Sequence, residues 1–352
     1  MAGDAGRKKL RIGVIGASGY TGADLIRLAA CHPHMDIALL AANTHAGKRL
    51  SEVFPHLGFI QAPPLVKSED ADWSTCDAVF CGLPHGTAQD IIATLPQSVK
   101  VIDMSADFRL KDTATYAKWY GREHAAPHLV KEAAYGLTEH YREEIAAARL
   151  VACPGCYPTA SLLALLPLVR AKVIEASDII IDAKSGVSGA GRSLKQNILF
   201  SEAGEGLSPY AVASHRHAPE IEQEISQAAG ESVLVNFTPH LVPMSRGELV
   251  TAYVRLKDQH KCADLAAALS DAYASAPFVR LAPKGTLPST QFVRGSNYCM
   301  IGVYADRIPG RAIVVSAIDN LVKGSAGQAV QNFNLMFGFP ETGGLQQLPL
   351  FP

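Results

Sequence analysis

The sequence predicts an α/β protein with a doubly wound parallel sheet in its first half and an α+β domain with a mixed or antiparallel sheet in its second half. First, short β-rich runs alternate with helix-like stretches through Met104. Second, a glycine-rich turn joins the first of these runs to the helical stretch after it. Third, strand-like alternation with few helices dominates after Val233.

The bulk composition indicates a packed globular protein and excludes some classes of partner. The chain has 352 residues, enough for two domains, and is 48% hydrophobic against 18% charged. Its net charge of −1 gives no basic excess for nucleic acid or an anionic membrane. No apolar run reaches the roughly 18 residues of a membrane span. Residues 1–9 are expected to form a solvated tail, or the remnant of a removed targeting peptide.

The glycine-rich turn has the features of a dinucleotide-binding site. The run Leu10–Ile15 is expected to be a strand and Ala23–Ala30 a helix, with G-x-x-G-x-x-G spacing between them. Glycines there let backbone N–H groups approach a pyrophosphate, and the helix N-terminus adds its field. A purely structural turn is the alternative. The predicted cofactor-binding residues of this turn are Gly13, Gly16, Ser18, Gly19, Tyr20, Thr21 and Gly22.

The next predicted strand, Ile37–Ala42, indicates which nucleotide is bound. NAD sites usually carry an acid near this strand end, to bond the ribose 2′-hydroxyl. Here the chain has Thr44, Lys48 and Arg49 instead. A hydroxyl and two cations suit a 2′-phosphate, so NADP(H) is the predicted cofactor. An ordinary solvated loop is the alternative.

Two further predicted strands, Ala78–Leu83 and Lys100–Met104, end in segments that belong at a ligand site. Ligands of doubly wound sheets bind outside the carboxyl ends of the strands. Pro84 and Gly86 are therefore predicted to contact the cofactor, and Ser105 and Arg109 are placed to bind an anion, with Arg109 as the candidate ligand. A surface or capping role is the alternative for Arg109.

Cys156 is predicted to be a nucleophile. It follows a Pro-Gly turn and opens an apolar helical run in Val151–Pro167, where a helix N-terminus favours thiolate over thiol. A buried cysteine beside a tight turn is the alternative, and so is a dithiol with Cys153. The seven cysteines are odd in number and widely spread, which indicates a reducing compartment. Zinc would need a second cysteine pair, so no metal is predicted.

Two later segments carry further polar groups. After a predicted strand at Asp178–Ala183, the Gly/Ser-rich loop through Ser188, Gly189 and Arg192 can form an anion nest, or be a flexible surface loop. His215 and His217 precede a helix at Glu220–Ala229, and in an extended segment their side chains point the same way. Zinc binding and a single acid/base histidine are both open for this pair, but no third ligand lies at convincing spacing, so here too no metal is predicted.

The rest of the chain supplies the second sheet and its helices. No chemistry is assigned to residues 111–150, where a charged helix is expected at Glu139–Ala148. The other expected strands are Val233–Thr238, Glu248–Leu256, Tyr298–Tyr304 and Ala312–Ile318, and the other expected helices are Leu265–Ala274 and a final helix through Met336.

Several motifs together resemble the N-acetyl-gamma-glutamyl-phosphate reductases, which are relatives of aspartate-semialdehyde dehydrogenase. The resemblance covers roughly residues 10–352, and AKSGVSGAGR, IDNLVKG and the ending LPLFP look closest to plant members. It implies a semialdehyde dehydrogenase-like fold: a Rossmann NADP-binding domain at 10–154 and 320–352, and a catalytic and dimerisation domain at 155–319. The motifs are GVIGASGYTG, GLPHGTA, DMSADFRL, CPGCYPT, KSGVSGAGR, HRHAPEIEQ, RGSNYC and DNLVKGSAGQAVQNFN.

The resemblance also implies a reaction. NADPH reduces N-acetyl-glutamyl 5-phosphate to the semialdehyde through a thioester on Cys156, and phosphate is released. The acid/base histidine falls in His-Arg-His, where His215 is preferred and His217 is the alternative. Arg109 maps to a phosphate-binding arginine, and Asn320 is expected near the nicotinamide. Thr159, Arg192 and Arg246 are further predicted substrate or phosphate residues.

The resemblance also bears on assembly and compartment. It implies a small-molecule acyl phosphate substrate and a homodimer or homotetramer. It implies the plastid stroma, in a mature form without transit peptide, with the bacterial cytoplasm as the alternative. The other functions considered are aspartate-semialdehyde dehydrogenase and a NADP-binding redox sensor without turnover. Cys153 stands where the family commonly has Asn, so a disulfide with Cys156 under oxidation is a hypothesis.

Overall fold

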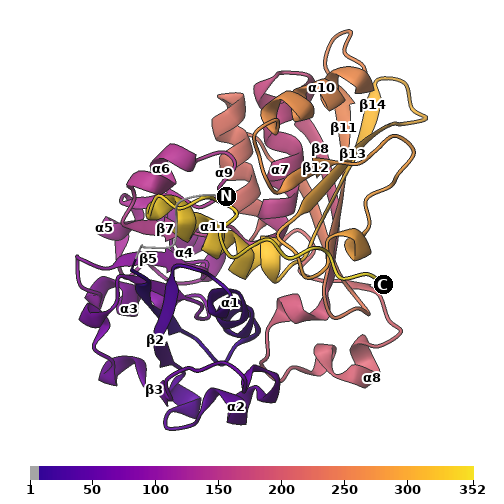
Figure 1. The fold of residues 1–352 in the computed structure, drawn as a ribbon. Helices are drawn as coiled ribbons and strands as arrows, with labels where there is room; N and C mark the ends of the chain where they lie inside the picture. The colour runs from indigo at the N-terminus through magenta and orange to yellow at the C-terminus, as the bar shows by residue number, and fades with distance from the viewer. Residues whose placement is uncertain (1–7) are drawn as a thin grey trace. The chain divides into compact units, whose positions relative to one another are not determined.

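A computed structural model describes residues 8–352, and its internal contacts divide the chain into two compact units (Figure 1). The first runs to Pro154 and takes in Ser325–Gln346, and the second comprises Gly155–Gly324 and Gln347–Pro352. The domain limits expected from sequence placed all of 320–352 in the first domain, and they stay a prediction. Most of the expected tail at residues 1–9 lies outside the described residues.

The first unit is built on a parallel sheet, as expected of a doubly wound fold. Its strand order is β3-β2-β1-β4-β5-β7-β6, and every described neighbouring pair is parallel. The carboxyl ends of these strands therefore share one edge. The strands are β1 Leu10–Ile15, β2 Met35–Ala41, β3 Leu65–Val66, β4 Ala78–Cys81, β5 Lys100–Asp103, β6 Ala133–Tyr135 and β7 Leu150–Ala152.

Helices cover both faces of this sheet. On one face Phe80 of β4 packs against Phe333 of α11, a helix from the end of the chain whose Met336 carbonyl accepts a bond from Lys100 Nζ. On the other face Val79 packs among apolar side chains that include Ile92 of α3. The helices are α1 Tyr20–Ala30, α2 Leu50–Val53, α3 Ala88–Thr94, α4 Thr113–Tyr120, α5 Pro127–Val130, α6 Arg142–Ala147 and α11 Gly327–Met336.

Residues 111–150 are more ordered than the sequence indicated. The segment contains α4, α5, β6 and α6 before β7, and β6 pairs in parallel with β7 at the edge of the sheet. The expected helix at Glu139–Ala148 is shorter, at Arg142–Ala147. Such short elements show too few periods of hydrophobic alternation to be predicted locally, and their stability comes from tertiary packing.

The second unit contains the mixed sheet that the sequence predicted. Its strand order is β12-β13-β14-β11-β8-β10-β9, with parallel pairing only between β8 and β10 and between β12 and β13 among the described strands. The predicted α/β class, with a parallel first sheet and a mixed second sheet, is therefore confirmed. The strands are β8 Ile174–Gly186, β9 Ser208–Pro209, β10 Asn236–Val242, β11 Glu248–Leu256, β12 Val279–Leu281, β13 Cys299–Ala305 and β14 Arg311–Ile318.

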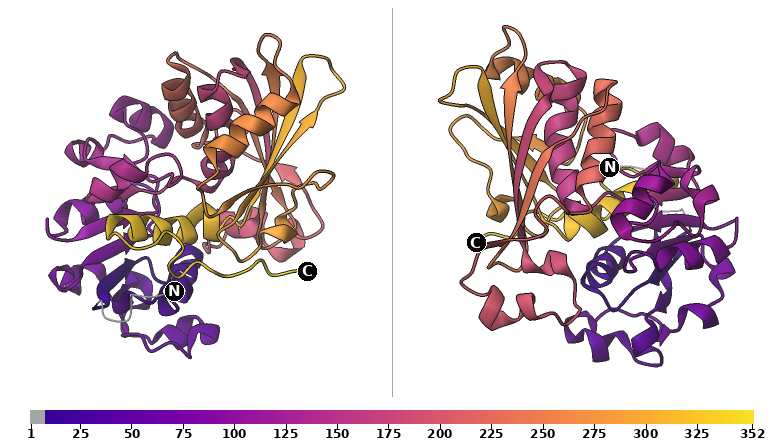
Figure 2. Two further views of the ribbon diagram at one scale, coloured as in Figure 1. Left: turned by 45° about the horizontal axis from the view of Figure 1, so that its top comes forward. Right: turned by 180° about the vertical axis from the view of Figure 1, so that it is seen from behind.

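One face of this sheet is covered by helices (Figure 2). The central helix α7 packs on β8, β11 and β14 and is flanked by α9 and α10. Every residue of α7 from Tyr157 to Val169 is buried, so the helix has no solvated stripe along this length. The helices of this unit are α7 Cys156–Arg170, α8 Phe200–Ala203, α9 Ala218–Ala229 and α10 Cys262–Ala272.

Two strands of the second unit differ from the sequence prediction. β8 continues past Ala183 to Gly186, and β10 begins later than expected and runs through Pro239 to Val242. The two strands pair with each other in register from Asn236↔Ile180 to Val242↔Gly186, so the extension of each strand pairs with the other strand. Pro239 is tolerated because the outer neighbour of β10 is the two-residue strand β9. This pairing joins segments that are distant in sequence. Gly186 and Pro239 therefore lie within strands, although glycine and proline locally predict that a strand ends.

Within residues 8–352, no helix combines the length and apolar character needed to cross a membrane.

Candidate active site

The carboxyl edge of the first sheet gathers four of the segments predicted to bind ligands. They follow β1, β2, β4 and β5 and contain the glycine turn, Thr44–Arg49, Pro84–Gly86 and Ser105–Arg109. Gly13 is the exception, because it lies inside β1, where a Cβ atom would be 2.7 Å from the ring of Trp73. The observed reason for glycine at this position is close packing.

The glycine turn has a backbone shape that excludes side chains. Gly16 has a φ of +84°, and a Cβ atom there would overlap the Gly82 carbonyl. A Cβ on Gly22 would overlap the Gly16 carbonyl. Helix α1 starts after Gly19, with no side-chain cap among the described residues and no acid in its first turn. First-turn amides without a side-chain cap suit a pyrophosphate, so this turn fits a dinucleotide.

The segment after β2 presents a hydroxyl and two cations at the surface. Thr44, Lys48 and Arg49 are all exposed, and Thr44 Oγ1 lies 3.1 Å from His45 Nδ1. Glu52 lies in the first turn of α2, where its carboxylate accepts the Arg49 backbone N–H at 2.7 Å. The side chains of the segment are accessible to a nucleotide phosphate.

Asp107 organises the loop after β4, and sequence analysis did not identify it. Its carboxylate accepts the Gly86 N–H at 2.7 Å, the Ala88 N–H at 3.2 Å and the Tyr116 hydroxyl at 2.7 Å. Arg122 donates to the Gly86 carbonyl at 2.6 Å. The predicted cofactor segment at Pro84–Gly86 is thus held by Asp107 and by Arg122, which comes from the stretch to which no chemistry was assigned.

Ser105 and Arg109 are engaged by the protein itself. Ser105 Oγ donates to Asp103 at 2.8 Å, and burial raises the pKa of Asp103 to about 7 despite the two hydrogen bonds from Ser105. Arg109 is 8% exposed, and its Nε donates to the Cys153 carbonyl at 2.7 Å and its Nη2 to the Met104 carbonyl at 3.2 Å. Arg109 therefore joins the ends of β5 and β7, and its predicted contact with phosphate stays a prediction.

In the second unit, Cys156 is the first residue of α7 and is partly exposed. The Gly155 N–H before it donates to the buried Glu220 carboxylate at 2.9 Å. A Cβ atom on Gly324 would lie 2.8 Å from the Cys156 Cβ, so only glycine fits there without displacement. Thr159 is fully buried, and its hydroxyl donates to the Gly155 carbonyl at 2.9 Å, which ties the first turn of the helix together.

The two histidines lie together next to this helix start. Their ring centroids are 4.7 Å apart, and His215 Nδ1 accepts the His217 backbone N–H at 3.1 Å. Burial, with a smaller effect of Arg216, lowers the pKa of His215 to about 4. The His217 ring abuts Gly155 so closely that a Cβ there would overlap its Nε2.

Glu248 lies near the thiol and is, after Asp107, the second functional residue that sequence analysis missed. It is the first residue of β11 and is fully buried. Desolvation raises the pKa of Glu248 to about 8, and a hydrogen bond with the Cys156 thiol lowers it. Tyr157 and Tyr210 also lie close enough to Glu248 and Cys156 to feel their charges. The Tyr210 hydroxyl donates to the Tyr157 hydroxyl at 3.3 Å. The sequence signal was an acid directly after the Arg-Gly pair, at the start of a strand whose alternate residues Val250, Ala252 and Val254 are apolar.

A further group of predicted residues converges around Asn320. Its Nδ2 donates to Ser188 Oγ at 2.9 Å, and its Oδ1 accepts the Gly247 N–H at 2.8 Å. Gly189 lies beside Asn320, and Arg246 contacts the buried Asp319 at 3.5 Å. Arg192, from the same predicted set, is exposed.

Cys153 has none of the features of a reactive thiol. It is 1% exposed, and burial raises its pKa to about 12, although the Asn332 amide lies 3.5 Å from its sulfur. Both Cys153 and Cys156 are free thiols in this structure. In the described part of the chain, no three His, Cys, Asp or Glu side chains are grouped to hold a metal ion.

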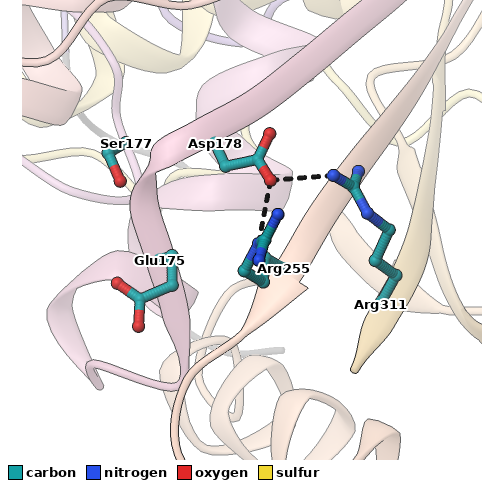
Figure 3. A pocket seen from close by; sticks show the side chains of 5 residues that line it. All are labelled: Glu175, Ser177, Asp178, Arg255 and Arg311. Atoms are coloured by element: carbon teal, nitrogen blue, oxygen red, sulfur yellow. Dashed lines mark hydrogen bonds and ion pairs between the residues drawn. The ribbon is translucent and has the colours of Figure 1, made fainter. Parts of the chain in front are cut away.

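A pocket elsewhere on the second unit lies apart from these residues. It is lined by Glu175, Ser177, Asp178, Arg255 and Arg311, and the Asp178 carboxylate joins the two arginines at 3.0 and 2.8 Å (Figure 3). Glu175, Ser177 and Asp178 lie toward the start of β8. Glu248 instead pairs with Ser185, near the end of β8. The pocket contains none of the predicted site residues.

Comparisons with known families identify both units. Residues 11–148 match the family described as "Semialdehyde dehydrogenase, NAD binding domain". Residues 156–320 match the "Semialdehyde dehydrogenase, dimerisation domain". The fold and these matches define a protein of the semialdehyde dehydrogenase class, whose first unit binds a nicotinamide cofactor.

Solved structures show the same fold. Aspartate semialdehyde dehydrogenase II from Vibrio cholerae, complexed with ASA, superposes with a TM-score of 0.71 at 17% identity, over 94% of this chain and 99% of that one. The Candida albicans enzyme with NADP gives a TM-score of 0.66 at 17% identity, again over 94% and 99%. At this identity the likeness concerns the fold alone.

Curated relatives are far more similar in sequence. A protein named "Probable N-acetyl-gamma-glutamyl-phosphate reductase, chloroplastic" from Arabidopsis thaliana is 55% identical over 98% of this chain and 86% of its own length. The N-acetyl-gamma-glutamyl-phosphate reductase of Rhodospirillum rubrum is 54% identical over 98% and 99%. The chain belongs to the N-acetyl-gamma-glutamyl-phosphate reductase family, and the resemblance seen in the sequence is confirmed.

The glycine turn yields a matched pair of substitutions. Gly22→Ala forces a methyl group into the Gly16 carbonyl, whereas a Cβ on Gly19 has its nearest contact at 3.5 Å. We expect Gly22→Ala to lower the free energy of unfolding by about 1–3 kcal/mol and to abolish nucleotide binding. Gly19→Ala should stay close to wild type in stability. Calorimetric unfolding and nucleotide titration measure both, and equal losses in the two variants would contradict this account of the turn.

Proposed function

We propose that the chain is an NADPH-dependent N-acetyl-gamma-glutamyl-phosphate reductase of arginine biosynthesis. It would convert N-acetyl-L-glutamyl 5-phosphate to N-acetyl-L-glutamate 5-semialdehyde and phosphate. The observation that carries the proposal is the Cys156 thiol at the first residue of a buried helix, in a chain 52–55% identical to relatives with this name.

The reaction needs a nucleophile because an acyl phosphate is also open to attack by water. Cys156 attacks the carbonyl carbon, phosphate leaves, and a thioester splits one difficult step into two easier ones. Amides of the first turn of α7 stabilise the oxyanion, together with the positive end of the helix. A nicotinamide cofactor bound at the α1 turn would supply the hydride that reduces the thioester.

His217 is the acid/base group in this proposal. Two observations support it over His215, which sequence analysis preferred. The His217 ring abuts Gly155, next to the nucleophile. His215 has a pKa lowered to about 4 and already accepts a backbone hydrogen bond at Nδ1, so it takes up a proton poorly at neutral pH. His215 then acts by positioning His217.

Phosphate release depends on cations. Arg109, Arg192 and Arg246 are the proposed ligands, with Ser105 and Thr159 supporting the segments from which ligands extend. The exposure of Arg192 supports direct contact with a ligand. The engagement of the Thr159 hydroxyl within α7 supports a structural role for that residue.

Asn320, Ser188 and Gly189 are proposed to lie at the nicotinamide end of the cofactor, and Thr44, Lys48 and Arg49 at the adenosine 2′-phosphate. Small-molecule acyl phosphate, phosphate and NADP(H) are the proposed ligands. The description of residues 156–320 as a dimerisation domain supports a homodimer or homotetramer.

The proposed compartment is the plastid stroma. Two plant relatives, from Arabidopsis thaliana and Oryza sativa, are named chloroplastic and are 55% and 54% identical to this chain. The bacterial cytoplasm is the alternative, because the Rhodospirillum rubrum relative is 54% identical.

The reaction run in reverse tests the proposed function. N-acetylglutamate semialdehyde, phosphate and NADP⁺ should yield NADPH, and omission of phosphate should stop turnover, because phosphate must cleave the thioester. Absorbance at the NADPH band measures this. Cys156→Ala should abolish turnover and keep nucleotide binding. Turnover without phosphate, or a preference for aspartate semialdehyde, would contradict the proposal.

The two histidines form their own matched pair. His217→Ala should lower kcat by about 10²–10⁴-fold with little change in KM, because proton transfer to the reacting groups is lost. His215→Ala should lower kcat less, and should lower the melting temperature, because its ring packs among Tyr157, Tyr210 and Phe237. Steady-state kinetics and calorimetry distinguish them. A larger loss of kcat in His215→Ala would reverse the assignment.

Cofactor choice tests the segment after β2. The double variant Lys48→Ala/Arg49→Ala should raise the KM for NADPH by about 10-fold or more, since two charge-assisted bonds to the 2′-phosphate are lost. The KM for NADH should change little. Lys131→Ala is the control, an exposed lysine just before β6, at the amino end of the sheet. Equal effects on the two cofactors would show that these cations do not read the 2′-phosphate.

A further inference from the structure

The buried acid Glu248 has no role in the mechanism described so far. On β11 the side chains that face the helices are Glu248, Val250, Ala252 and Val254, and each is fully buried. Glu248 is the one ionisable member of this row, at its end beneath the start of α7. Removing a carboxylate from water is unfavourable unless a partner compensates. An acid in this buried row therefore needs a neighbouring group that exchanges a hydrogen bond or a proton with its carboxyl.

The surroundings of Glu248 offer one such partner. On the neighbouring strands it pairs with Ser185 and Ile318. Among the described residues, neither carboxylate oxygen accepts a hydrogen bond of standard geometry. The Cys156 thiol is the group whose hydrogen bonding acts on the carboxyl. A fully buried acid without a conventional donor thus lies against the predicted nucleophile.

The charged and titratable groups around Glu248 leave the thiol as its proton partner. From α7 they are Cys156 and Tyr157, and from the segment after β9 it is Tyr210. Burial raises the pKa of both tyrosines, which keeps their hydroxyls neutral. The strands β8 and β14 present Ser185 and Ile318, which do not titrate in this range. Nearby, Arg246 and Asp319 face each other at 3.5 Å.

The buried Glu248 carboxylate is a stronger base than an exposed one. Desolvation raises the pKa of Glu248 to about 8. A carboxyl with an ordinary pKa near 4.3 would be a much weaker base toward a thiol.

We propose that Glu248 accepts the thiol proton of Cys156 as the nucleophile attacks, and returns it when the sulfur leaves. This inference rests on the proposed function for its substrate. In the first step the S–H bond breaks and an O–H bond forms on the carboxylate. The sulfur bonds to the acyl carbon, and the acyl C–O bond breaks with its electron pair leaving on phosphate.

The second half of the cycle restores both groups. The hydride that reduces the thioester would come from the nicotinamide cofactor. The resulting thiohemiacetal oxyanion on Cys156 collapses to the aldehyde, and its C–S bond breaks. The sulfur takes its proton back from the Glu248 carboxyl. The proton that the net reaction consumes goes to phosphate from His217, which solvent then recharges. Glu248 and His217 thus serve different atoms.

Glu248→Gln tests the proposal because glutamine keeps the size and a hydrogen-bond donor but cannot accept the proton. The expected result is a kcat lower by about 100-fold or more, with KM and nucleotide binding close to wild type. The control is Glu224→Gln, which removes a buried acid from α9 of the same unit and should retain kcat. A kcat for Glu248→Gln within a few-fold of wild type would overturn the proposal.

Alkylation of Cys156 by iodoacetamide tests the shared proton without any substrate. In the wild type, coupled ionisation should give two steps in the rate against pH, the first near pH 8, where the pair loses its first proton. Glu248→Gln should show a single step, and Glu224→Gln should keep two. A wild-type profile with one step, or two steps retained in Glu248→Gln, would overturn the proposal.

These two measurements also distinguish this inference from the proposed function. Phosphate-dependent turnover that survives in Glu248→Gln would reject the role of Glu248 and leave the reaction standing. A wild-type protein without turnover but with a two-step profile that Glu248→Gln abolishes would reject the reaction and retain the proton pair.

Discussion

The complete burial of α7 is the constraint on which the second unit depends. A helix buried on every side from Tyr157 to Val169 must be matched by its neighbours throughout, because protein interiors are close-packed. Its rotation and position are therefore fixed by packing on β8, β11 and β14 and not by solvent. The thiol of its first residue inherits that rigidity. Close approach then requires glycine at Gly324, and it brings the ring of His217 against Gly155.

Most polar groups around the start of α7 are satisfied locally, and this makes the exception informative. The Gly155 N–H donates to Glu220, and the Gly155 carbonyl accepts from Thr159. The Tyr157 hydroxyl donates to the His240 carbonyl at 3.2 Å. Buried polar groups are normally paired in this way. Glu248 departs from that rule, because neither of its carboxylate oxygens accepts such a hydrogen bond. It lies against the Cys156 thiol, the group that we propose as the nucleophile.

The sequence predicted those parts of the fold and site that local signals determine. The limits of β1 and β11 were predicted correctly, and Cys156 was expected at a helix start, because alternation, turn residues and apolar runs act over a few residues. Asp107 and Glu248 were missed because their roles arise from pairing across distant segments. Hydrogen bonding in the folded chain also decides what a predicted residue is free to do: the Thr159 hydroxyl is occupied within its own helix, which no motif could reveal.

The two cysteines of the Cys-Pro-Gly-Cys segment show how strongly environment outweighs residue type. Cys153 belongs to the first unit, directly after β7. It is fully buried, and burial raises its pKa to about 12. Cys156 begins α7 in the second unit, partly exposed at the positive end of a helix. A dithiol switch needs two accessible thiols with thiolate character. Cys153 has neither property, which weighs against a redox sensor and leaves Cys156 as the candidate nucleophile of the pair, in agreement with the proposed thioester mechanism.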